Sequence, residues 1–309
     1  MELILWEGAV EKAVKIWHEC CSSIIDFVNY FLNRGQIMNI LVSQLRSIGA
    51  ATLVLILGMA VIAFGMLAWS DAYADVANTT HNMGSNGSGN TFSGTAEICV
   101  FCHTPHGGDS SASVPLWNKT LVSASYTTYD TLGTSSLDGA VAPVGSVSIA
   151  CLSCHDGTQA MDIVLNEPGS GAVVASYNTG TWTGSSSPTG IALIGTDLTN
   201  DHPIGIQYGG GGLTVNTTTG PTNDPDFVPP ATDVINANTI WWVDTEPTAN
   251  GTRQKTDMQL YTRSVAAIDG GLDQPFVECA SCHDPHAETQ TFLRISNDDS
   301  AVCLACHVK

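Results

Sequence analysis

The chain has 309 residues, of which 43% are apolar, and its 29 acidic and ten basic side chains give a formal net charge of −19 at pH 7. A chain this acidic repels the phosphate backbone, which excludes nucleic acid as a partner.

The N-terminal part of the chain has the pattern of a secretory signal peptide. Residues 49–69 are almost entirely apolar, Arg46 precedes them, and Ala72-Tyr73-Ala74 follows directly before Asp75. A basic residue, an apolar run and a small-x-small site in this order are typical of a cleaved export signal. The alternative is an uncleaved membrane anchor, because about 20 apolar residues can span a bilayer.

We therefore predict that residues 1–74 are a leader and signal peptide that is removed, with Met38 as an alternative start of translation. The mature chain, residues 75–309, keeps six basic and 23 acidic side chains, a formal charge of −17. It is expected to be exported, extracellular or on the cell surface, and free of the membrane. A large net charge keeps such a protein soluble.

All eight cysteines of the mature chain fall into four Cys-x-x-Cys pairs, and a histidine follows each pair directly. This run is the attachment signature of c-type haem. One turn of chain presents both thiols to the two vinyl groups of a porphyrin, and the adjacent histidine reaches the iron from the same side. The predicted thioether residues are Cys99, Cys102, Cys151, Cys154, Cys279, Cys282, Cys303 and Cys306, and the predicted proximal iron ligands are His103, His155, His283 and His307.

Zinc ribbons and disulfides also use paired cysteines. Neither explains a histidine after every pair, so the sequence predicts four covalently attached c-type haems.

Four further histidines remain in the mature chain, as many as there are haems. We predict that they are the distal iron ligands, which makes every iron bis-histidine and six-coordinate. Met83 is a competing ligand, two residues from the first of them. The predicted distal ligands are His81, His106, His202 and His286.

Two of these distal candidates lie three residues beyond a proximal histidine. Pro105 and Pro285 stop a helix from continuing smoothly there. We therefore expect His106 and His286 to ligate a neighbouring haem.

Closed irons favour electron transfer over chemistry on a bound substrate, because a catalytic metal site keeps an open position. The protein is therefore predicted to be an electron carrier rather than an enzyme. An oxidoreductase with one open haem iron is the alternative from another functional class.

The spacing of the motifs predicts the fold class. The first cysteines of successive motifs are 52, 128 and 24 residues apart. The long interval is expected to be irregular chain with a few short strands, for example at 172–177. The sequence thus predicts a mostly irregular fold with short helices at the haem motifs and a core built around four haems.

The histidine and cysteine motifs together resemble a known family. They are Thr80-His81-Asn82-Met83, Cys99 to His106, Asp201-His202-Pro203 and Cys279 to His286. They resemble the doubled Cys-x-x-Cys-His cytochrome family. The haem count and layout resemble those of extracellular tetrahaem cytochromes that polymerise into conducting filaments.

The resemblance implies a continuous stack of haems and one distal histidine supplied by the adjacent subunit. We expect that ligand to be His81, six residues after the predicted mature N-terminus. The implied partners are further copies of the chain, joined head to tail, and other cytochromes or extracellular electron acceptors. A monomeric secreted or periplasmic electron shuttle is the alternative.

Overall fold

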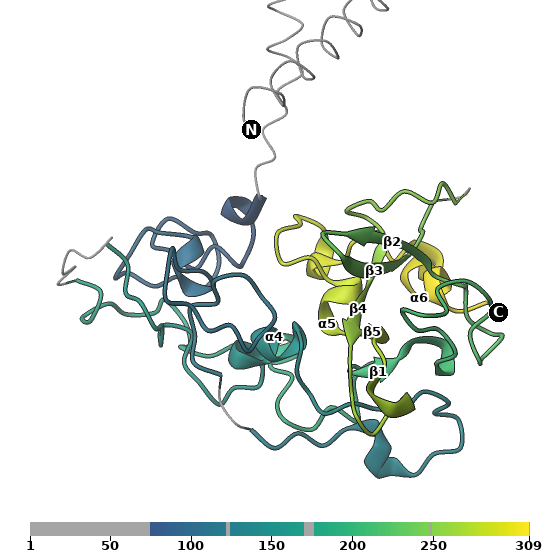
Figure 1. The fold of residues 1–309 in the computed structure, drawn as a ribbon. Helices are drawn as coiled ribbons and strands as arrows, with labels where there is room; N and C mark the ends of the chain where they lie inside the picture. The colour runs from purple at the N-terminus through teal and green to yellow at the C-terminus, as the bar shows by residue number, and fades with distance from the viewer. Residues whose placement is uncertain (1–74, 122–123, 170–175, 247–248, 309) are drawn as a thin grey trace, which may run out of the picture. The chain divides into compact units, whose positions relative to one another are not determined.

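Figure 1 shows a computed structural model of the protein. The model describes residues 75–121, 124–169, 176–246 and 249–308. The predicted leader, residues 1–74, lies outside the described residues, as do residues 172–175 of the expected strand; Ser176 and Tyr177 belong to a turn. Within the described ranges, no helix has both the length and the apolar character needed to cross a membrane.

Five antiparallel strands form one sheet with the order β1-β5-β4-β3-β2 (Figure 1). These strands are short and lie in the interval between the second and third motifs, where the sequence predicted a few short strands. The strands are β1 (Ile206–Gln207), β2 (Ala231–Ile235), β3 (Asn238–Val243), β4 (Met258–Arg263) and β5 (Gln274–Val277).

Local sequence explains the β2–β3 hairpin. β3 is rich in β-branched and aromatic residues, which pack well on a pleated surface. The turn residues Asn236 and Ala237 both have positive φ, 50° and 64°. Two consecutive residues with positive φ form a tight two-residue turn whose twist matches that of the paired strands. The hairpin places Trp241 opposite Thr232 of β2, while Leu260 of β4 lies opposite Trp241 on its other side.

Three clusters of buried side chains reach the motif cysteines. The smallest consists of Ala112, Trp117 and Ala150 and packs against Cys102. The sheet cluster packs against Cys282 and Cys306 and consists of Tyr208, Leu213, Trp241, Val243, Met258, Leu260 and Val277. The N-terminal cluster packs against Cys102 and Cys154 and consists of Met83, Phe92, Val100, Phe101, Met161 and Tyr177.

Each motif lies in a short helix. These helices are the 3-10 turn Cys99–Phe101, α4 (Ser148–His155), α5 (Cys279–Cys282) and α6 (Ala301–Cys306), and further short 3-10 turns lie outside the motifs. Helix α5 contacts both α4 and β4, so the second and third motifs are neighbours (Figure 1).

A buried carboxylate joins α4, α5 and β4. Glu278 caps α5 in a capping box with Ser281, and its side chain also accepts a hydrogen bond from Ser148 at the start of α4. Arg263 of β4 donates to Glu278 at 3.1 Å; the side chain of Glu278 is fully buried and that of Arg263 is 14% exposed. Burial raises the pKa of Glu278, and Ser148 and Arg263 oppose that shift.

Replacing Arg263 with methionine is expected to lower the free energy of unfolding by about 3 kcal/mol, because a buried charge loses its partner. Loss of the cation raises the pKa of Glu278 further. A carboxyl with a raised pKa in the folded state makes stability fall as pH rises, so the loss should be larger at about pH 8 than at about pH 5.

Denaturant unfolding of the haem-loaded protein at the two pH values measures this effect. The double variant Arg263→Met, Glu278→Gln removes both charges and should recover most of the stability. Equal loss at both pH values would contradict the assigned role of the carboxylate.

Candidate haem-binding sites

The four Cys-x-x-Cys-His runs are called motifs 1 to 4 in chain order, and each occupies one helical turn. The amide of the motif histidine donates to the carbonyl of the first cysteine in motifs 1, 3 and 4, at 2.7, 3.1 and 3.0 Å. Motif 2 lies at the end of α4. One turn therefore brings both thiols and the histidine of a motif together, as attachment to one porphyrin requires.

The motif thiols are all free. None of the eight described cysteines is in a disulfide. Among the described residues, no group of three or more Cys, His, Asp or Glu side chains is placed to share a metal ion.

The motifs adjoin one another in the order 1-2-3-4. Burial raises the pKa of Cys102 to about 12, and the nearby thiol of Cys154 adds to the shift, so motif 1 adjoins motif 2. The thiol of Cys151 hydrogen-bonds to the sulfur of Cys279, which raises the pKa of Cys151 and lowers that of Cys279, so motif 2 adjoins motif 3.

The last two motifs are neighbours in the same way. Burial raises the pKa of Cys306 to about 12, with the nearby thiol of Cys282 as the next cause. Burial likewise raises the pKa of Cys282, and Cys303 adds to that shift. Cys102 and Cys154 also pack against the same cluster, as do Cys282 and Cys306, and α4 contacts α5. The four motifs therefore form one uninterrupted series.

Two pairs of histidine rings have the spacing of imidazoles that share one metal. Such rings have centroids about 6.3 Å apart, because each metal–nitrogen bond is about 2.0–2.1 Å and each centroid lies about 1.1 Å beyond its nitrogen. The centroids of His103 and His286 are 6.2 Å apart, with 15° between the ring planes. Those of His81 and His155 are also 6.2 Å apart, with 71° between the planes. Both pairs fit an iron held between two imidazoles.

Hydrogen bonds orient the rings of the motif histidines. His103 donates from Nδ1 to the carbonyl of Pro115 at 2.8 Å, His155 to that of Ala192 at 2.7 Å, and His283 to that of Thr291 at 2.8 Å. A metal-bound histidine usually donates its second ring nitrogen in this way, which fixes its tautomer. Nε2 of each ring is then the nitrogen left to bind a metal.

The predicted distal ligands His81 and His286 are held by similar contacts. Nδ1 of His81 lies 3.2 Å from the carbonyl of Pro285, and its ring stacks on Phe292 with centroids 4.1 Å apart. Burial is the main cause that lowers the pKa of His81, which favours the neutral imidazole that binds metals. Nδ1 of His286 lies 3.4 Å from the carboxylate of Asp284.

The expectation that His81 ligates an adjacent subunit stays a prediction. His81 faces His155 of its own chain, and the loop of motif 3 holds it there through Pro285 and Phe292. The geometry therefore supports ligation within the chain. Met83, the competing ligand, is buried in the N-terminal cluster.

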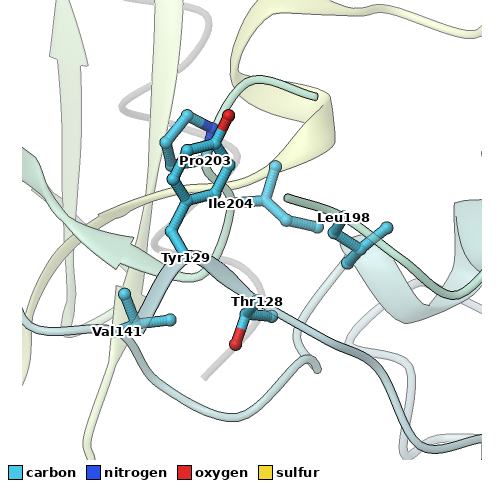
Figure 2. A pocket seen from close by; sticks show the side chains of 6 residues that line it. All are labelled: Thr128, Tyr129, Val141, Leu198, Pro203 and Ile204. Atoms are coloured by element: carbon cyan, nitrogen blue, oxygen red, sulfur yellow. The ribbon is translucent and has the colours of Figure 1, made fainter. Parts of the chain in front are cut away.

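The other two predicted distal ligands, His106 and His202, are exposed. Nδ1 of His202 donates to the carbonyl of Pro203 at 3.0 Å. Tyr129 donates its hydroxyl to the carbonyl of Asp201 at 2.5 Å, which ties the His202 segment down. Figure 2 shows the pocket beside this segment, whose largely apolar lining is Thr128, Tyr129, Val141, Leu198, Pro203 and Ile204.

Exposed apolar side chains lie beside several motif histidines. Ile191, 93% exposed, precedes the carbonyl that holds His155. Leu116 follows Pro115, whose carbonyl accepts the hydrogen bond from His103. Leu304 and Val308 lie on either side of His307 in the sequence. All three side chains are exposed. A large flat apolar cofactor suits such surfaces, because it removes them from water.

Sequence reasoning identified the motifs but missed the residues that support them. Phe292 and the carbonyls of Pro115, Ala192 and Thr291 carry no signal in the sequence, since backbone contacts leave no residue preference. Lys119, described below, had one usable signal: it is one of only three lysines in residues 75–309.

Comparison with known proteins supports the haem interpretation. Residues 274–309 match the family model described as the doubled CXXCH motif, a segment that contains motifs 3 and 4. No curated protein matches the sequence. The match indicates covalently attached c-type haem and supports a multihaem c-type cytochrome-like protein, a class that generally carries electrons.

Proposed function

We propose that the mature chain carries four c-type haems and conducts electrons outside the cell as a subunit of a polymeric filament. The observation that carries this proposal is the uninterrupted series of neighbouring motifs. Cys102 and Cys154 pack against one cluster, α4 contacts α5, and Cys282 and Cys306 pack against another cluster. Cofactors attached through neighbouring thiols are themselves neighbours. Each bound haem supplies a one-electron iron couple.

The histidine pairs support electron transfer rather than catalysis. In this proposal His103 and His286 hold the iron at motif 1, and His155 and His81 hold the iron at motif 2. An iron with two imidazoles has no position for a substrate.

Polymerisation is supported by the two exposed histidines. We assign the ligand donated to the adjacent subunit to His202, in place of His81. His202 is exposed, and its bond to Pro203 directs Nδ1 inward and leaves Nε2 to bind iron. The receiving iron belongs to motif 3 or motif 4, and His106 supplies the remaining distal ligand. A head-to-tail contact that does not close produces an open filament.

Electron microscopy and carbon monoxide binding test this assignment together. Native protein should form filaments that bind no carbon monoxide, and dissociated chains should bind one molecule each at the iron that lost its ligand. His202→Ala should stay dissociated and bind one molecule. His106→Ala should still polymerise and open one iron within the filament.

Other outcomes would identify the alternatives. Discrete native particles that bind no carbon monoxide would indicate a monomeric tetrahaem shuttle. Native filaments that bind carbon monoxide would indicate an open iron and thus an oxidoreductase.

A further inference from the structure

Lys119 is a buried cation outside the haem motifs. Its side chain is fully buried, and Nζ donates to the carbonyls of Ala160, Met161 and Ile163 at 3.1, 3.1 and 2.7 Å. Three donated hydrogen bonds use every proton of an ammonium group, whereas a neutral amine has only two to give. The contacts therefore describe a charged lysine solvated by backbone dipoles, although burial lowers its pKa.

This cation lies between the attachment points of motifs 1 and 2. The amide of the preceding residue, Asn118, donates to the carbonyl of Cys102 at 2.9 Å. Met161, whose carbonyl binds Nζ, belongs to the cluster that packs against Cys102 and Cys154. The charge of Lys119 acts on both thiols, where it opposes the upward pKa shift that burial causes.

Lys119 also has a structural role, because its three hydrogen bonds hold the turn at 160–163. Such a role needs donors but no charge. The charge itself matters for a neighbouring redox centre. Reduction adds an electron to iron, and a cation in a medium of low dielectric constant stabilises the reduced form strongly.

We propose that Lys119 raises the reduction potentials of the haems attached at motifs 1 and 2 above the values that their bis-histidine ligation alone would set. The inference rests on haem attachment at these two motifs, which is part of the proposed function, and not on polymerisation. It divides the series of haems into a first pair under the influence of a buried cation and a second pair beyond it.

The test is a potentiometric titration of the haem-loaded protein, followed by absorbance and by electron paramagnetic resonance. The ring planes at motifs 1 and 2 differ by 15° and 71°, so these irons should give separate resonance signals. The Lys119→Gln variant keeps two donors for the carbonyls and removes the charge. It should lower the reduction equilibrium constants of these two irons about tenfold, or about 59 mV for one electron.

Three further variants complete the design. Lys119→Arg keeps the charge and should retain the native potentials. Arg253→Gln removes an exposed cation and should also leave them unchanged. Asp162→Asn removes an anion that acts on Lys119, and should raise the potentials of the same two irons. It keeps the side-chain oxygen that accepts from Trp182 at 3.0 Å.

A haem count on each variant separates failure of this inference from failure of the proposed function. Four haems with unchanged potentials in Lys119→Gln would overturn the role of Lys119, and so would an equal shift of all four irons. If Lys119→Gln does not fold, unchanged potentials in Asp162→Asn overturn it. A native protein with no haem at motifs 1 and 2 would instead overturn the proposed function.

Discussion

Replacing His286 with alanine is expected to convert one of the four irons from low spin to high spin in isolated chains. The ring of His286 faces that of His103 at 6.2 Å, and its removal leaves the iron of motif 1 with one axial ligand. Absorbance and resonance spectra of the ferric protein, with carbon monoxide binding to the ferrous form, measure the change. The variant should bind one more molecule per chain than dissociated native protein.

The variant His286→Met is the matched control, since it restores six coordination with a different ligand. It should remain low spin and raise the potential of one iron, because Met/His ligation favours the reduced state. A His286→Ala chain whose irons all keep their native spin states would show that the ring pair does not hold an iron.

The same measurement on His81→Ala distinguishes ligation within a chain from ligation between subunits. The contact between His81 and His155 predicts one additional open iron in isolated chains, with filament assembly retained. If isolated chains were unaffected and only filaments were lost, His81 would be the ligand shared between subunits.

The second large effect is expected when haem attachment is prevented. Protein with all eight motif cysteines replaced by alanine should lose most of its native circular dichroism. All three clusters of buried side chains described above pack against motif cysteines, so their outer layer is expected to depend on the cofactor. A fold whose core is completed by a cofactor is unstable without it.

The loss should be uneven along the chain. The described residues before Ile206 contain one α-helix, α4, and none of the strands β1 to β5. All five strands lie from Ile206 onward. Hydrogen exchange of the haem-free protein should therefore retain some protection at β3 and β4 and none at residues 75–121. Native-like dichroism without haem would contradict the dependence on the cofactor.

The family match over motifs 3 and 4 agrees with the haem attachment predicted from the sequence. Covalent attachment can be predicted because it needs a fixed local spacing, which one turn of helix satisfies. The sequence did not predict where the strands of the sheet lie. Trp241 and Trp242 are adjacent and both buried, which conceals the alternation that marks a strand with one exposed face.

The pairing of distal ligands could not be predicted for a different reason. His103 meets His286 and His155 meets His81 through contacts between segments far apart in the chain. The histidine count limited the candidates, but only the tertiary fold pairs them. The diverging chain after Pro285 led us to expect that His286 ligates a neighbouring haem. Its ring lies 6.2 Å from that of His103 in motif 1, which is two places from motif 3 in the series.

The loop after motif 3 affects the order in which the protein matures. This loop carries His286 and the contacts of Pro285 and Phe292 with His81, so it completes motifs 1 and 2 from the far end of the chain. A chain synthesised from its N-terminus presents motifs 1 and 2 well before that loop emerges. In the proposed pairing, the first two haems therefore wait with exchangeable coordination until the C-terminal segment arrives. Truncated chains would consequently be distinguishable from complete ones by reactive iron.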